Sequence, residues 1–135
     1  AEVLGSLGGQ GALVVHGYGG LDELTTNGPN RVSCLRDGKV CTYELDAGEL
    51  GLRRAAPEDL RGGAPPENAA LLRSVLSGQD RSPRRDVVLL NAAAALVTEG
   101  DNFRSALEEA TGALERGAAL EKLDQLVSFS QKLVQ

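Results

Sequence analysis

Two adjacent carboxylates, Asp22 and Glu23, are the residues of this sequence best suited to chemistry. They follow a short apolar run and a glycine-rich loop in the stretch VVHGYGGLDEL (residues 14–24). In open α/β sheets, ligands bind beyond the carboxyl ends of strands. Carboxylate oxygens suit Mg²⁺, which takes one or two protein carboxylates and completes its shell with water and substrate phosphates. We consider a magnesium site here; the alternatives are a solvated acidic loop, the more frequent origin of such short motifs, and an aspartate near a helix N-terminus.

The single histidine, His16, does not indicate another type of active site. His-Gly-x-Gly-Gly after a strand is similar to the oxyanion loop of α/β-hydrolases, but the sequence has no G-x-S-x-G nucleophile elbow. One histidine is also too few for the usual zinc site. We expect His16 to have a structural or loop-orienting role.

Two other pairs of polar residues have structural interpretations. Cys34 and Cys41 oppose each other in the hairpin predicted below, at a separation that permits a disulfide, but we expect free, buried thiols. Asn68 and Asn91 lie on predicted helices at positions where burial is plausible. Because a buried amide without partners costs about 1–3 kcal/mol, we expect each to make a helix-to-loop hydrogen bond.

The elements that must position the acidic pair begin with a helix and a strand. Apolar residues of VLGSL (3–7) share a helical face, and Gly8-Gly9 end that helix. Residues 12–15 (ALVV) are a continuous apolar run, which is typical of a parallel strand covered by helices on both faces. Residues 16–30 form the loop after it.

A β-hairpin follows, because Asp37-Gly38 separates two alternating segments, RVSCLR and KVCTYEL. Asp-Gly between strands is the strongest short-range hairpin signal, since both turn residues must accept positive φ. A two-residue turn sets the cross-strand pairs: Arg36 with Lys39, Cys34 with Cys41, and Val32 with Tyr43. We expect the face that carries the last two pairs to be buried.

The rest of the chain is mainly helical. Residues 46–63 are irregular apart from one helical turn at PEDL. Helices are predicted from about Pro66 to Leu76 with Gly78 as the stop, from Pro83 to Gly100, from an Asn102 cap to about Arg116, and over residues 118–133. The helix after Pro83 is apolar on nearly every side, so we expect it to be central. The inward residues predicted for the first and last of these helices are Leu71, Leu72, Val75 and Leu76, and Leu120, Leu123, Leu126, Val127 and Leu133.

Composition excludes several classes of function. A length of 135 residues fits one domain. The net charge is −5 and the 14 basic residues are scattered, which argues against nucleic-acid binding because phosphate attraction drives it. No apolar run approaches the roughly 18 residues that span a bilayer, and the first residues do not form a signal peptide. Two cysteines without C-x-x-C indicate the reducing cytoplasm.

The predicted elements make an α/β fold, but a single parallel strand cannot form a sheet by itself. We therefore expect its neighbours in another part of a longer chain. The sequence contains no methionine and opens on what looks like the end of a helix. We expect Ala1 to be an internal residue of a longer protein.

Taken together, the segments resemble the C-terminal part of the anthranilate phosphoribosyltransferase family. The resemblance rests on ALVVHG (12–17), GLDELT (20–25), GGAPPENA (62–69) and RDVVLLNAAAAL (85–96), and on the trailing ERGAALEKLDQLVSF. Their order and spacing match the family, and the similarity covers essentially all 135 residues. Each segment alone is weakly specific, whereas the ordered set is strongly so.

The resemblance implies a nucleoside phosphorylase/phosphoribosyltransferase-type α/β domain, with a mixed sheet, a hairpin and packed helices, of which residues 1–135 are the C-terminal part. It implies transfer of phosphoribosyl from phosphoribosyl pyrophosphate to anthranilate, in tryptophan biosynthesis, with release of pyrophosphate. It also implies Mg²⁺ on Asp22 and Glu23, bound to the pyrophosphate, and extended backbone would let the two side chains serve two ions.

Other parts of the family pattern lie upstream of Ala1. They are the phosphate loop, the anthranilate-contacting residues and the N-terminal helical domain that forms the homodimer interface. We therefore expect this chain alone to be inactive. The alternatives are a nucleoside phosphorylase-like relative, which needs no acidic pair, a nucleic-acid-binding relative, which needs a basic groove, and a fragment that only completes a sheet.

Overall fold

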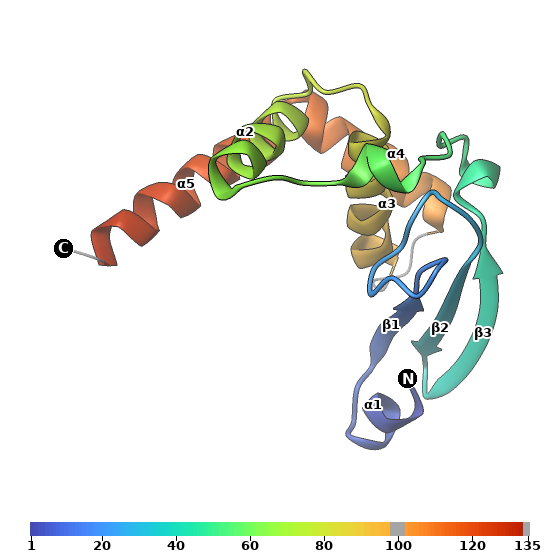
Figure 1. Cartoon of the computed structure of the whole chain (residues 1–135). Coiled ribbons are helices and arrows are strands. Elements are labelled where there is room, and N and C mark those ends of the chain that lie inside the picture. The colour runs from blue at the N-terminus through green and yellow to red at the C-terminus, as the bar shows by residue number, and fades with distance from the viewer. Residues whose placement is uncertain (98–101, 134–135) are drawn as a thin grey trace.

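The computed structural model describes residues 1–97 and 102–133. A small antiparallel sheet with α1 (Glu2–Ser6) lies at one end of the molecule, and the long helix α5 (Ala118–Leu133) extends away from the other end (Figure 1). The remaining helices lie between them. The α/β class predicted from the sequence is confirmed.

The sheet contains β1 (Gly11–His16), β2 (Asn30–Arg36) and β3 (Lys39–Leu45) in that order. The parallel orientation predicted for residues 12–15 is wrong, because β1 pairs antiparallel with β2. Gly11 lies opposite Arg36 at one end of this pairing, and His16 lies opposite Arg31 at the other. The expected burial on both faces is also wrong, since Leu13 and Val15 pack on the core while Val14 is 42% exposed. The physical reason is that the loop after β1 returns the chain beside the same strand. Among the described residues both strand pairs are antiparallel, so the mixed sheet is not seen there.

The hairpin of β2 and β3 has the predicted turn and register. Asp37 and Gly38 both have positive φ, at 50° and 71°, and Cys34 pairs with Cys41. The face of the hairpin that was predicted to be buried is buried only at Val32. On the same face, Cys41 is exposed and Tyr43 is 37% exposed. The helices cover β2 and the last residue of β3, Leu45, but the rest of β3 is exposed at the edge of the sheet.

The helices begin where the sequence predicts. The Asn102 side chain accepts a hydrogen bond from the Ser105 N–H at 2.9 Å and so caps the helix that begins at Phe103. Pro83 is the first residue of the preceding helix, and PEDL forms a single 3₁₀ turn. Residues 98–100 of the predicted central helix lie outside the described residues. The bounds are η1 (Ala47–Leu50), η2 (Pro57–Leu60), α2 (Pro65–Leu76), α3 (Pro83–Val97) and α4 (Phe103–Glu115).

Helix α3 is central, as predicted. Its residues Leu90, Ala93, Ala94 and Val97 join the main core with residues of the sheet and α4. Leu89 belongs to a second cluster with Val75, Ala110 and Leu114. Because α3 contributes to both clusters, it connects the sheet end of the molecule to the helical end.

The predicted burial of α5 is wrong. None of its described residues is buried, and Leu126 and Leu133 are 61% and 71% exposed. Leu72 of α2 is likewise exposed, although Val75 is buried as predicted. An amphipathic pattern identifies an apolar face but does not supply the layer that covers it, and the C-terminal part of α5 projects beyond the other elements (Figure 1). None of the described helices has the length and apolarity needed to cross a bilayer.

Candidate functional site

The glycine-rich loop after β1 makes a tight turn directly before the acidic pair. The Gly17 N–H donates to the Leu21 carbonyl at 2.8 Å, and the Gly20 N–H donates to the Gly17 carbonyl at 3.1 Å. A Cβ on Gly17 would lie 2.2 Å from the Glu23 carbonyl oxygen, so only glycine fits this position. This turn brings the backbone of Glu23 against the end of β1.

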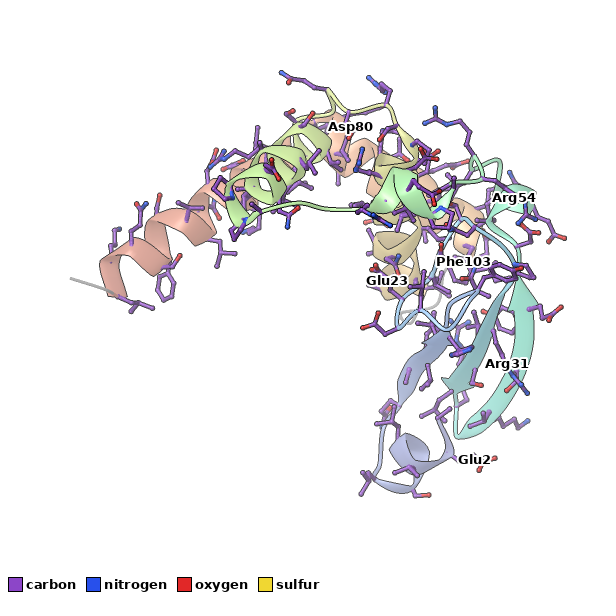
Figure 2. The ribbon with its side chains drawn as sticks, viewed as in Figure 1. Glu2, Glu23, Arg31, Arg54, Asp80 and Phe103 are labelled. Atoms are coloured by element: carbon purple, nitrogen blue, oxygen red, sulfur yellow. The ribbon has the colours of Figure 1, made fainter. Side chains whose placement is uncertain are left out.

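The carboxylates of Asp22 and Glu23 are both exposed. Neither makes an ion pair or hydrogen bond with a residue in the part of the chain that the structure describes. In the view of Figure 2, Glu23 lies to the left of the labelled Arg31 and Arg54. The oxygen ligands of both side chains are therefore free to take a cation.

In contrast, the backbone immediately after the pair is fixed by Asn91 of α3. The Leu24 N–H donates to Asn91 Oδ1 at 3.0 Å, and Asn91 Nδ2 donates back to the Leu24 carbonyl at 2.8 Å. The same Nδ2 donates to the Val87 carbonyl at 3.0 Å. The predicted helix-to-loop hydrogen bond is confirmed, and the side chain is half-buried.

Asn30 fixes the next residue, Thr25, in the same way. The Thr25 N–H donates to Asn30 Oδ1 at 2.8 Å, and Asn30 Nδ2 donates to the Thr25 carbonyl at 2.9 Å and to the Leu45 carbonyl at 3.1 Å. Asn30 is fully buried. The sequence analysis missed this residue; the run of Thr25, Thr26, Asn27 and Asn30 before a strand was the available signal for a hydrogen-bonded loop.

Asn68, the other predicted amide, makes a similar contact farther along the chain. It accepts a hydrogen bond from the Gly63 N–H at 2.8 Å and donates to the Gly63 carbonyl at 2.9 Å. Its predicted helix-to-loop bond is confirmed, but the residue is exposed rather than buried. Three asparagines thus bind one loop residue each through both backbone groups.

A half-open cavity of about 490 Å³ adjoins the acidic pair. Glu23 and Arg61 are the charged residues of its lining, and most of the other lining groups are apolar. Asp22 is not part of this lining. The wall is completed by Tyr18, Gly19, Leu21, Asn27, Pro57 and Leu60.

The remaining predicted candidates lie elsewhere. His16 is exposed opposite Arg31, and its orienting role stays a prediction. Cys34 is half-buried and both thiols are free, so their predicted free state is confirmed while burial of Cys41 is not. Burial raises the pKa of Tyr43, and the neighbouring Cys34 and Cys41 add to that increase.

Two charged groups that the sequence analysis did not single out fix the beginning of α3. Asp86 is buried and accepts a hydrogen bond from Arg53 Nε at 3.0 Å. Asp80 accepts one from the Ser82 N–H at 2.6 Å. Partial burial tends to raise the pKa of Asp80, but the bonds from Ser82 and the nearby Arg84 outweigh it, so the pKa is lowered.

The ligands present fit a magnesium ion that is shared with a substrate. The described residues contain no cluster of three or more histidine, cysteine or acidic side chains that would hold a metal by themselves. Two neighbouring carboxylates that make no ion pair and lie beside a cavity are instead the ligand set that Mg²⁺ uses when water and phosphate oxygens complete its shell.

Comparisons with known proteins identify the family of this chain. A family model described as "Glycosyl transferase family, a/b domain" matches residues 1–120. An anthranilate phosphoribosyltransferase of Roseiflexus castenholzii is 52% identical over 133 residues, which are 96% of this chain and 39% of that protein.

Solved structures give the same result. The crystal structure of anthranilate phosphoribosyltransferase from Thermus thermophilus matches with a TM-score of 0.82 and 39% identity, over 93% of this chain and 37% of that one. The enzyme from Saccharomyces cerevisiae in complex with PRPP and Mg matches with a TM-score of 0.76 and 28% identity, over 86% of this chain and 34% of that one. The chain thus spans between about a third and two fifths of the length of these relatives.

Proposed function

The chain belongs to the glycosyl transferase family that this a/b domain defines, and from that membership we propose that it is part of an anthranilate phosphoribosyltransferase. Residues 1–135 would form the C-terminal part of the phosphoribosyltransferase α/β domain of a cytoplasmic enzyme. The N-terminal helical domain, its homodimer interface and the contacts to anthranilate would lie in the rest of the whole protein. The observation that carries the proposal is an acidic pair with unpaired oxygens, in a chain that aligns with such enzymes over 96% of its length.

The reaction would substitute one group at C1 of the ribose. The amine nitrogen of anthranilate forms a bond to C1, and the C1–O bond to pyrophosphate breaks with its electron pair going to pyrophosphate. The amine then loses a proton to solvent. Bound Mg²⁺ would stabilise the negative charge that develops on the leaving pyrophosphate.

Asp22 and Glu23 would hold the metal through their free oxygens. Of the two carboxylates, only that of Glu23 lines the cavity. This difference in position supports a separate ion for each carboxylate. The fixed backbone of Leu24 and Thr25 keeps the pair at the end of β1 before any ligand arrives. In this arrangement the chain contributes metal binding, while the other substrate contacts come from the rest of the protein.

The test is a double variant, Asp22→Asn with Glu23→Gln, in the whole protein. The affinity for Mn²⁺ as a magnesium analogue, measured by electron paramagnetic resonance with phosphoribosyl pyrophosphate present, should fall at least about tenfold. Formation of phosphoribosyl-anthranilate should fall with it, and the melting temperature should change little, because exposed loop carboxylates rarely carry stability.

The matched control is Glu108→Gln with Glu109→Gln, an exposed adjacent acidic pair on α4 that undergoes the same change of charge. It should leave the Mn²⁺ affinity unchanged. Equal Mn²⁺ affinities in the wild-type protein and the Asp22/Glu23 variant would overturn the metal site. Product formation by the 135-residue chain alone would overturn the proposed division of the active site.

A further inference from the structure

We propose that Asn91 is a positioning residue that holds the acidic pair in its metal-binding geometry through the backbone of Leu24. This inference rests on the proposed function, because it concerns the same carboxylates. Asn91 itself lies on α3, 68 positions after Glu23 in the sequence, and is not offered as a metal ligand or as a group that contacts substrate.

The geometry of the contact specifies one orientation of the amide. Oδ1 faces the Leu24 N–H, whereas Nδ2 faces two carbonyls, those of Leu24 and Val87. A flipped amide would place its oxygen against both carbonyl oxygens and lose every one of these bonds. The Val87 carbonyl is one turn earlier on the same helix, so α3 itself fixes the direction in which Asn91 presents its amide to the loop.

Leu24 is also held through its side chain. That side chain is fully buried in the core cluster that contains Leu90 and Ala94 of α3. The backbone of Leu24 is therefore bonded to α3, and its side chain is buried in a core to which α3 contributes. Asn30 holds the following residue, Thr25, from the sheet.

The segment before the pair is held by the backbone hydrogen bonds of its own turn, from the Gly17 N–H to the Leu21 carbonyl and from the Gly20 N–H to the Gly17 carbonyl. Gly19 and Gly20 have positive φ, and a Cβ at either position would meet nothing within 4 Å. The exposed Asp22 and Glu23 thus connect a glycine turn on one side to the contact with α3 on the other. Without the Asn91 bonds, the peptide that follows Glu23 loses its nearest polar anchor, so more of the ordering of the carboxylates falls to the metal itself.

Groups that orient a metal ligand without touching the metal commonly change its affinity by about 10–100-fold when they are removed. Leucine at position 91 has the same number and branching of side-chain heavy atoms as asparagine, although its methyl groups are bulkier, and it adds no charge and cannot make the hydrogen bonds. We expect Asn91→Leu in the whole protein to weaken Mn²⁺ binding about tenfold, measured by electron paramagnetic resonance with phosphoribosyl pyrophosphate present.

The matched control is Asn68→Leu, which removes the same pair of bonds to the backbone of Gly63. It should lower the melting temperature without changing the Mn²⁺ affinity. A second comparison uses the double variant Asp22→Asn with Glu23→Gln as the background. If Asn91 acts through the position of these two carboxylates, Asn91→Leu should have little further effect on Mn²⁺ affinity there, because the changes remove the same interaction.

Two results would overturn the inference while leaving the proposed function intact. One is an unchanged Mn²⁺ affinity in Asn91→Leu when Glu23→Gln weakens binding. The other is an equal loss in both backgrounds, which a general loss of structure would produce. If Asp22→Asn and Glu23→Gln both leave Mn²⁺ binding unchanged, the proposed function fails and the inference with it.

A measurement on the wild-type protein covers the case in which Asn91→Leu does not fold. The Leu24 amide should be strongly protected from hydrogen exchange in the absence of metal, since its acceptor is already in place. Protection of Leu24 that appears only after Mg²⁺ and phosphoribosyl pyrophosphate are added would overturn the inference.

Discussion

The side chain of Asn30 binds both backbone groups of Thr25, accepting from its N–H at 2.8 Å and donating to its carbonyl at 2.9 Å. Both residues are buried. Because Asn30 is the first residue of β2 and also donates to the Leu45 carbonyl at the end of β3, it joins the acidic loop to two strands. The loop is thus part of the folded core rather than a flexible appendage.

Asn30→Ala should be among the most destabilising substitutions in the chain. It removes the amide that bonds the buried N–H and carbonyl of Thr25, and each buried group left without a partner costs about 1–3 kcal/mol. We expect the free energy of unfolding in urea to fall by about 3 kcal/mol. Asn102→Ala, which removes a single exposed cap bond, should cost only about 1 kcal/mol; equal losses would contradict the role given to Asn30.

Gly17→Ala should destabilise the acidic loop by a steric effect. The added Cβ would lie 2.2 Å from the Glu23 carbonyl oxygen, and forced overpacking costs about 1–3 kcal/mol. Gly19→Ala is the comparison, because its φ is +77° but its Cβ would meet nothing. Chemical denaturation should show the larger loss for Gly17→Ala, and Mn²⁺ binding should weaken only in that variant.

Asp86→Asn should show how much a buried carboxylate at the beginning of α3 contributes. Its partner Arg53 is 58% exposed, so solvent screening limits the expected loss to about 1–2 kcal/mol. Asp124→Asn breaks the exposed pair with Arg73 and should cost less than about 1 kcal/mol. Added salt should reduce the second effect more than the first, as urea titrations at low and high ionic strength can establish.

Asp80 should contribute a stability term that depends on pH. Its pKa is lowered in the folded protein, so the folded state binds the proton more weakly than the unfolded state. The contribution is present above the unfolded pKa, at about 4, and disappears as the pH falls through the lower folded value. The difference in melting temperature between wild-type protein and Asp80→Asn should therefore be largest near neutral pH and should shrink below about pH 4. A difference that does not change with pH would contradict the lowered pKa.

Polar substitutions on α5 should have little effect on the stability of this chain. Leu126 and Phe129 are both 61% exposed, so Leu126→Gln and Phe129→Gln should each change the free energy of unfolding by no more than about 0.5 kcal/mol. Leu90→Ala, in the core, should cost about 2–5 kcal/mol. A loss above about 2 kcal/mol for Leu126→Gln would show that this face is covered in solution.

Several elements could be predicted because their causes are local. Asp37-Gly38 determines the hairpin register through positive φ, and Ser82-Pro83 and Asn102 mark the first turns of α3 and α4. Asn91 could also be predicted to bond a loop, since an amide in an apolar helix needs a partner. Neither the direction of β1 nor the exposure of α5 was predicted correctly, because each depends on which other element lies beside it.

By itself, the sequence determined the local geometry of this protein and the presence of two neighbouring carboxylates in a glycine-rich loop. These features depend on backbone torsions, caps and residue type, which act over a few positions. Only the tertiary structure decided that β1 returns antiparallel to β2, that Asn91 and Asn30 reach Leu24 and Thr25, and that Glu23 lines the cavity while Asp22 does not. The reason is that such contacts join separate elements of the fold, and their partners are selected when the whole core packs.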